Sequence, residues 1–497
     1  MLLESLFLIP IILGILCLVF TTTKQIGYMQ AVGTFILFGI GLFIAKQTLD
    51  LGSICFMKDI IRIDALSALM ILLITLVGLL ASIYSIGYMT NQVEEKIQNI
   101  WKFKLYYLLL NIFMLTMLIV VSTNNIGIMW IAIEATTLVS AFLVGYYNKE
   151  RPVEAAWKYI ILCTVGIALA MIGIILVYYA VTKIGGIREA GLNWDYLSSV
   201  AHKLDHGLIK TAFVFILIGF GTKAGLAPMH SWLPDAHSEA PTPVSALLSG
   251  VLIKCGLYGI IRFMVLANIS IGGNFTSELL LIFGLISLFI ATLFILIQTN
   301  IKRLLAYCSL EHIAVITCGL AFGTPIATFG ALIHMINHAM IKTLMFFTSG
   351  NLALKYHTKD MSHIRGAINI MPYSGTVLLI GGLALAGSPP FSIFLSEFYI
   401  LFGGWQSGHF IACALFLLML VIVFGGLLSH ILEITIGPVS NTSPEAPNMA
   451  KGEINKSSLI AIIIPLFIIC LLGFYIPTPL FNLLNEAVRI LNMGHNL

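Results

Sequence analysis

Fourteen long apolar stretches constrain this chain more than any other feature. Crossing about 30 Å of hydrocarbon takes about 20 mainly apolar residues in a helix, and each stretch comes close to or exceeds that length. The runs are continuously apolar instead of alternating over about ten residues, as the strands of a membrane barrel do. We therefore predict an all-α, polytopic membrane protein of about 14 transmembrane helices. The stretches are 3–20, 28–46, 63–83, 105–122, 125–147, 156–181, 208–229, 242–266, 277–298, 303–322, 325–349, 373–402, 409–432 and 457–476.

Composition excludes several other classes of protein. Hydrophobic residues make up 59% of the chain and charged residues only 10%, against about 25% charged in a soluble domain. The net charge of +4 is scattered, without the basic cluster that nucleic-acid binding requires. The eight cysteines stand singly with no CxxC, so we expect no metal or redox cofactor in this chain. A GxGxxA match at 219–224 lies inside a span, which indicates helix packing, not dinucleotide binding.

The chain is predicted to be a single integral membrane domain over residues 1–497. Its first apolar stretch follows Met1 without a basic segment or a cleavage site, so we expect it to be retained as a span. The hydrophilic segment 433–456 is predicted to be an inner loop, with the last span and the C-terminal tail in 457–497. If both termini are outside, the loops on the inner side carry more Lys and Arg than the loops on the outer side. We expect a multi-pass protein of the inner or plasma membrane with both termini outside.

Two spans contain helix-breaking residues at corresponding places. In the seventh span Gly225 and Pro228 follow Lys223, and in the twelfth Pro389 and Pro390 precede Glu397. Breaks of this kind are tolerated in a membrane where the freed backbone groups line a polar cavity. The breaks lie five spans apart, which predicts two five-helix repeats, 104–266 and 277–432. Because five is odd, the repeats would be inverted relative to each other.

Four ionisable residues stand out inside the predicted spans: Glu134, Lys223, Lys254 and Glu397. A charge near the bilayer centre costs at least about 2.5–3.5 kcal/mol, so each needs a reason. An interhelical ion pair, or a lysine that reaches the interface, would be a structural reason. A lysine removed from water beside a carboxylate instead has a proton affinity that depends on their separation. We favour a proton relay.

Histidines extend this polar series. His334, His338 and Lys342 recur every four residues and share one helix face, while His230 and His237 flank the segment WLPDA. Two histidines at this spacing could bind a metal or form a structural hydrogen-bonded pair, but the glutamate of an HExxH motif is absent. Histidine titrates near neutral pH, so we favour a proton path over both alternatives.

Several motifs together resemble one family. KAGLAPMHSWLPDAHSEAPTPVSALLSGVLIKCGLYGIIR (223–262) resembles the signature of the antiporter-like, proton-translocating membrane subunits of complex I and energy-converting hydrogenases. YSIGYM (84–89), IKRLLAYCSLEH (301–312) and HMINHAMIKTLMFF (334–347) are similar to the same family in the same order. SLEH, PPFSIFLSE and HSEAPTPVSALLSG look most like component F of hydrogenase 4 and formate hydrogenlyase-type complexes.

The resemblance implies fourteen spans, inverted five-helix repeats and a buried polar axis along the membrane midplane. It also implies roles for four residues: Lys223 paired with Glu134, Lys254 as the central relay, and Glu397 as the terminal group of the second half. Some relatives carry lysine where this chain has Glu397.

The favoured function is proton translocation in an energy-converting oxidoreductase complex, by a subunit with no redox site of its own. Nickel–iron and iron–sulfur centres would then belong to peripheral redox subunits, beside further membrane partners. The alternative is a subunit of a multi-subunit sodium/proton antiporter, and sodium remains possible as the transported ion. A scaffold with remnant buried charges is a third possibility, which the number of intramembrane ionisable groups disfavours.

Overall fold

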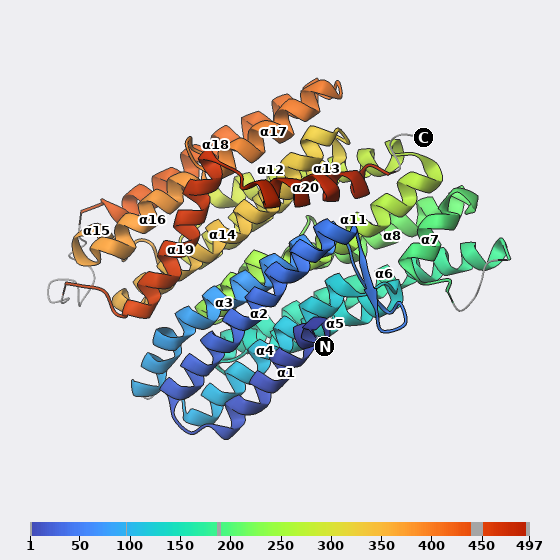
Figure 1. The fold of residues 1–497 in the computed structure, drawn as a ribbon. Coiled ribbons are helices and arrows are strands. Elements are labelled where there is room, and N and C mark those ends of the chain that lie inside the picture. The colour runs from blue at the N-terminus through green and yellow to red at the C-terminus, as the bar shows by residue number, and fades with distance from the viewer. Residues whose placement is uncertain (1, 96, 186–189, 439–450, 494–497) are drawn as a thin grey trace.

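The computed structural model describes residues 2–95, 97–185, 190–438 and 451–493 as one bundle of long helices (Figure 1). The elements in chain order are α1 (Leu2–Val19), α2 (Thr23–Leu51), β1 (Ile54–Phe56), β2 (Ile61–Ile63), α3 (Ala65–Glu94), α4 (Ile100–Ser122), α5 (Ile126–Val144), α6 (Glu150–Lys183), α7 (Trp194–Val200), η1 (Ala201–Lys203), α8 (His206–Ala224), α9 (Trp232–Glu239), α10 (Thr242–Leu247), η2 (Leu248–Leu252), α11 (Ile253–Ile271), α12 (Asn274–Leu296), α13 (Ile301–Ala321), α14 (Pro325–Tyr356), α15 (Ala367–Ile370), α16 (Pro372–Leu385), α17 (Ser392–Gln406), α18 (Phe410–Thr435), α19 (Lys456–Phe474) and α20 (Thr478–Leu491).

All fourteen predicted spans are helical, which confirms the all-α membrane fold. Eleven helical segments of the described chain are long and apolar enough to cross a membrane. The other three predicted spans are α1, the 32-residue α14, and the pair α16–α17 that together form the broken twelfth span. The eighth span is continuous from α10 through η2 into α11.

The termini of the helices follow ordinary capping chemistry. Side chains of Thr22, Asp64 and Asp205 accept hydrogen bonds from backbone N–H groups at the starts of α2, α3 and α8. Such caps satisfy donors that have no partner within the helix. Pro325 occupies the first turn of α14, where its missing N–H costs nothing.

The small hairpin and the interfacial helix were not expected. Strands β1 and β2 pair antiparallel with Ile54 opposite Ile63, and they form the one two-stranded sheet within the described ranges. The amphipathic helix α20 follows the last span and packs against α3 and α14. The hairpin, α7 and α20 lie toward one end of the bundle, and α15 lies toward the other (Figure 1). Residues 439–450 of the predicted inner loop lie outside the described residues.

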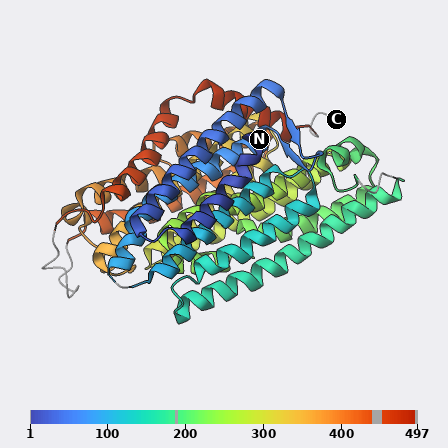
Figure 2. The same ribbon diagram turned by 60° about the horizontal axis from the view of Figure 1, so that its bottom comes forward.

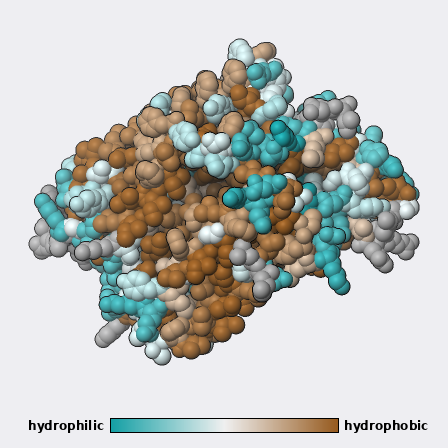
Figure 3. Space-filling model, viewed as in Figure 1, coloured by the Kyte–Doolittle hydropathy of each residue, from teal (hydrophilic) through white to brown (hydrophobic). Residues whose placement is uncertain are grey.

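The helices divide into a buried centre and an apolar rim. The most apolar windows of Thr242–Ile271 and of α13 are entirely buried, whereas only about a third of those of α18 and α19 is buried. Hydrophobic side chains cover much of the middle of the molecule, and hydrophilic ones gather toward its ends (Figure 3). The view in Figure 2 shows the long α6 along the edge of the bundle. Polar side chains on the central helices are thereby shielded from lipid, as intramembrane charges require.

The broken spans support the predicted inverted repeat. In the first repeat α8 ends at Gly225, whose φ of +83° leaves the helical region, and α9 continues the span. In the second repeat Gly387, with a φ of +77°, lies in the break between α16 and α17. Glycine adopts such angles without a steric penalty. The breaks are five spans apart in a chain that crosses the bundle at each span, so the two repeats have opposite orientation.

Candidate functional site

Lys223 lies where the first broken span opens. It belongs to the last turn of α8 and is fully buried. The indole N–H of Trp232 on α9 donates to the backbone carbonyl of Thr222 at 2.8 Å. A carbonyl left at the end of a helix needs such a partner. This hydrogen bond from α9 therefore stabilises the break at the end of α8.

Two neutral oxygens receive the ammonium group of Lys223. Its Nζ donates to the Thr137 hydroxyl at 2.8 Å and to the Tyr159 hydroxyl at 2.6 Å. The Tyr159 hydroxyl also lies 2.8 Å from the Ser140 hydroxyl, and its ring packs against the Trp232 ring. Tyr159 is on α6 and was not among the predicted site residues. A single tyrosine in an apolar stretch is common in membrane helices, so the sequence did not single it out.

Glu134 lies on α5, one turn before Thr137. Its Oε1 accepts a hydrogen bond of 2.7 Å from the Thr164 hydroxyl, and its Oε2 is buried without a hydrogen-bond partner. Among the ion pairs of the described residues none joins Glu134 to Lys223. In this conformation, then, the pair implied by the resemblance is not in direct contact, and Thr137 lies in between on the same helix face.

Lys254 occupies the centre of the bundle, directly after a π-helical turn. The turn η2 interrupts the regular pattern of backbone hydrogen bonds, and such turns are frequent at functional sites. Lys254 Nζ donates to the carbonyl of Gly250 at 2.6 Å. It also lies 2.9 Å from Nδ1 of His338 on α14. An ammonium can only donate, so Nδ1 of His338 accepts and its proton is on Nε2.

A chain of imidazole rings continues from His338. The ring of His312 lies 5.0 Å from that of His338 and 5.1 Å from that of His334, measured between centroids. Nδ1 of His312 and Nε2 of His334 are 3.0 Å apart, and Nδ1 of His334 is 2.8 Å from the hydroxyl of Ser396 on α17. Helices α13, α14 and α17 therefore meet at three histidines and a serine.

Glu311 and His312 are site residues that the predictions did not include. Both are buried on α13, and Nε2 of His312 lies 3.3 Å from a carboxylate oxygen of Glu311. Their adjacency in the SLEH motif was the available signal, but neighbours in a helix usually point in different directions.

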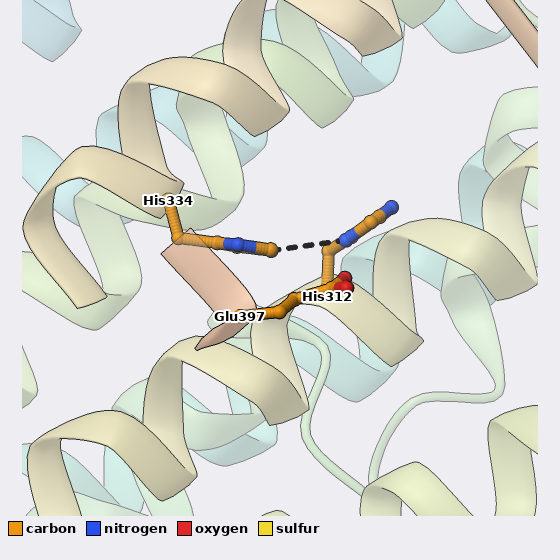
Figure 4. A group of neighbouring side chains, drawn as sticks. All are labelled: His312, His334 and Glu397. Atoms are coloured by element: carbon orange, nitrogen blue, oxygen red, sulfur yellow. Dashed lines mark hydrogen bonds between the residues drawn. The ribbon is translucent and has the colours of Figure 1, made fainter. Parts of the chain in front are cut away.

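Glu397 ends the series in the second half. It is partly buried on α17, and Figure 4 shows it reaching toward His312 and His334. A Cβ added at Gly387 would lie 2.4 Å from Glu397 Oε2, so the carboxylate packs directly against the broken turn. It also borders a cavity of about 210 Å³ between α16, α17 and α18.

The remaining predicted residues lie near the axis without joining its hydrogen-bonded segments. Lys342 is buried and donates to the carbonyl of Leu305 at 2.9 Å. His237 is fully buried, stacks on Phe346, and has no protein partner for either ring nitrogen. Nδ1 of His230 is also without a partner. Buried polar atoms of this kind are usually satisfied by water.

A buried ion pair closes the axis toward the hairpin end. Arg262, two turns after Lys254 on α11, binds both carboxylate oxygens of Asp64 at 2.7 Å. It also donates to the hydroxyls of Ser67 and Tyr258. Burial by itself raises the pKa of Asp64, but the guanidinium of Arg262, together with Arg62 and the backbone N–H of Ser67, outweighs burial and holds that pKa well below its ordinary value. Asp64 and Arg262 were not among the predicted site residues, although they lie within the predicted spans 63–83 and 242–266.

The axis thus consists of alternating amines, imidazoles and carboxylates within an apolar bundle. Lys223, Lys254 and His338 come from different helices, and each group can gain or lose a proton. Three of the links are direct hydrogen bonds between titratable groups: Lys223–Tyr159, Lys254–His338 and His312–His334. Such an arrangement suits stepwise proton transfer.

The family models match most of this region. Residues 123–423 match the transmembrane family of NADH:quinone oxidoreductase and Mrp antiporter subunits, and residues 60–99 match the N-terminal family of complex I chain 5. The first match covers more than half of the chain. The chain belongs to the NADH:quinone oxidoreductase/Mrp antiporter family. It is an antiporter-like membrane subunit of the kind found in complex I and hydrogenase-type complexes.

Relatives agree with this assignment. The hydrogenase-4 component F homolog of Methylacidiphilum infernorum is 36% identical over 383 residues, which are 77% of this chain and 80% of that protein. Hydrogenase-4 component B of Escherichia coli is 34% identical over 360 residues, 70% of this chain but only 50% of that protein. A chain of the membrane-bound sulfane sulfur reductase, an archaeal respiratory membrane complex, superposes with a TM-score of 0.86 at 25% identity, covering 99% of this chain and 98% of that one.

Proposed function

We propose that this antiporter-like subunit translocates protons in an energy-converting oxidoreductase complex of the hydrogenase-4 or formate hydrogenlyase type. Electrons move in partner subunits that carry the nickel–iron and iron–sulfur centres, and this chain contributes no redox group. The relay consists of Glu134, Lys223, Lys254, Glu397, His230, His237, His334, His338 and Lys342, with Glu311 and His312 added from the geometry. The protein lies in the inner or plasma membrane with both termini outside.

The observation that carries the proposal is the direct contact between Lys254 and His338. The lysine has two carbonyls and one imidazole as partners and no carboxylate. A buried ammonium without a carboxylate is costly, so the proton on Lys254 is readily released when its surroundings change. His338 is placed to receive that proton on Nδ1. Its Nε2 has no hydrogen-bond partner and is the atom that would release a proton in the next step.

A polar cavity provides the proton entrance in this proposal. It has a volume of about 290 Å³ and lies between the start of α6, α9 and the start of α13. Asp235 on its wall is paired with Lys158 at 2.5 Å and with Arg303 at 2.6 Å. These charged residues lie on the side of the bundle that the distribution of Lys and Arg predicts to be the inner side of the membrane. Buried His237 lies on the same short helix as Asp235.

Proton pumping is tested with the complex purified through a tag on this chain and reconstituted into vesicles. Electron transfer should acidify or alkalinise the vesicle lumen, as read by a pH-sensitive dye. Lys254→Ala should abolish the pH change in assembled complex, and the exposed Lys203→Ala should serve as the control. Normal pumping by assembled Lys254→Ala complex would refute the relay.

The alternative is a subunit of a multi-subunit sodium/proton antiporter, which the family's inclusion of Mrp antiporters supports. The carboxylates Glu134 and Glu397 are ligands that sodium accepts. In the same vesicles, an imposed sodium gradient should then change the internal pH without electron transfer. A response only to electron transfer excludes this alternative.

A further inference from the structure

Two histidines and a glutamate from three different helices converge at one point. The candidate ligand atoms of His312 on α13, His334 on α14 and Glu397 on α17 all lie within 4.8 Å of one another (Figure 4). This set differs from the pair His334 and His338 that the helical spacing brought forward. It includes a carboxylate, and it excludes Lys342.

The hydrogen bonds around His334 determine which of its nitrogens is free. The Ser396 hydroxyl lies 2.7 Å from the carbonyl of Ile393, which can only accept, so the hydroxyl proton is used there. In the tautomer in which the hydroxyl donates to that carbonyl, Nδ1 of His334, 2.8 Å from the same hydroxyl, donates to it. The neutral ring then has its lone pair on Nε2, which points at His312.

His312 has a matching second partner. Its Nε2 lies 3.3 Å from a carboxylate oxygen of Glu311 without an aligned hydrogen bond, and its Nδ1 carries the proton when Nε2 of His334 is the acceptor. Moving that proton from Nδ1 to Nε2 gives Glu311 a donor and leaves Nδ1 with a lone pair. Histidines that bind metals usually donate their other N–H to a carboxylate or a similar acceptor. Here Glu311 and Ser396 occupy both of these supporting positions.

We propose that His312, His334 and Glu397 form an inhibitory binding site for Zn²⁺ or a similar divalent transition-metal ion. Two imidazole nitrogens and one carboxylate oxygen, with water in the fourth position, are a usual zinc ligand set. Zinc–nitrogen bonds of about 2.0–2.1 Å imply nitrogens about 3.4 Å apart in tetrahedral geometry. The observed 3.0 Å between Nδ1 of His312 and Nε2 of His334 therefore needs to increase by only a few tenths of an ångström.

The cavity beside Glu397 gives its carboxylate space to adjust, and the other residues on the cavity wall are apolar. This cavity of about 210 Å³ has Glu397 on its wall and extends between α17 and α18. Lys254, hydrogen-bonded to His338 next to His312, adds positive charge nearby and weakens cation binding. The site therefore takes up added metal reversibly and is emptied by chelators. Inhibition rests on the proposed function, because the ion would replace protons on two relay histidines. Metal binding by itself does not depend on the proposed function.

Binding is tested with Co²⁺, whose visible absorption reports tetrahedral coordination. The chelator-treated complex, purified through this chain, should bind one equivalent per chain and release it to Zn²⁺. His334→Ala and Glu397→Gln should each weaken binding by at least about tenfold, and Glu311→Gln by about 10–100-fold. The control His357→Ala removes an exposed histidine and should bind as the wild type does. If His334→Ala does not assemble, the two glutamate variants decide.

Wild-type binding by all three variants, or no binding by the wild type, would overturn the site. Proton transport is then measured with and without Zn²⁺. A wild type that binds one Zn²⁺ but never pumps contradicts the proposed function and leaves the site intact. A wild type that pumps normally with the site filled contradicts the inhibitory role alone. We expect Zn²⁺ to stop pumping in the wild type and in His357→Ala alike, with half-inhibition at the concentration that half-fills the site in the binding measurement.

Discussion

Nζ of Lys254 lies 2.9 Å from Nδ1 of His338, so an amine after the π-helical turn of the eighth span meets an imidazole of the eleventh span. The two residues are 84 positions apart in sequence, and they belong to different five-helix repeats. The contact therefore joins the two halves of the protein at its centre. We expect a change in the protonation of Lys254 to change the proton affinity of His338.

His338→Ala should slow pumping more than it reduces the amount of assembled complex. The change removes the group that receives the proton of Lys254, but it leaves the surrounding apolar packing largely in place. Added imidazole should partly restore the rate, since it supplies a titrating group of the same kind. Proton flux per assembled complex is the measurement. A loss of assembly equal to the loss of flux would point to a structural role.

Lys223→Ala should abolish coupled translocation while the complex still assembles. Lys223→Arg should also impair it, because a guanidinium stays protonated at any relevant pH and cannot release its proton. Tyr159→Phe removes one of the two hydroxyls that bind the ammonium and should give an intermediate rate. Vesicle acidification assays compare the three variants. Normal pumping by Lys223→Ala would contradict its place in the proton relay.

Glu134→Gln should slow turnover, whereas Glu134→Asp should retain part of it. The carboxylate influences Lys223 through its charge across Thr137, and aspartate preserves that charge at shorter reach. Thr164→Val is the matched control, because it removes the hydrogen bond to Glu134 and keeps the charge. Equal losses in both glutamate variants would instead indicate packing.

Chelation should leave proton translocation unchanged, because we expect the relay to need no resident metal. Elemental measurement of the purified chain before any metal addition should find less than one zinc or nickel per chain. Stoichiometric metal that is lost in His334→Ala, together with loss of activity, would contradict the water-filled proton path.

Asp64→Asn should lower the free energy of unfolding at pH 7 by about 3–5 kcal/mol, because it leaves the buried Arg262 without its carboxylate. The pKa of Asp64 is lowered in the folded state, so its stabilising effect is present above the ordinary pKa of about 3.9 and is lost as the pH falls below it. The wild type and the variant should therefore converge in strongly acidic solution. Thermal unfolding in detergent from pH 7 to below pH 3 should show the difference narrowing steadily, with exposed Asp50→Asn as the control. A difference independent of pH would contradict the ion-pair explanation.

The sequence alone determined the spans and their breaks. Hydrophobic length and the positions of glycine and proline are local properties, so the fourteen helices and the openings at Gly225 and Gly387 followed from them. The same reasoning singled out Lys223 and Lys254, since a charged residue in an apolar run is visible without any structure.

Only the tertiary structure decided which groups meet. Contacts such as His312–His334 join residues on different helices, and they depend on how each helix is rotated and displaced along its axis. Apolar stretches do not encode that rotation, because nearly every face of a central helix is hydrophobic. Tyr159 and Ser396 look ordinary in sequence for the same reason, yet one binds Lys223 and the other orients His334. The separation of Glu134 from Lys223 by Thr137 likewise follows from side-chain positions across two helices, which no spacing within a single helix specifies.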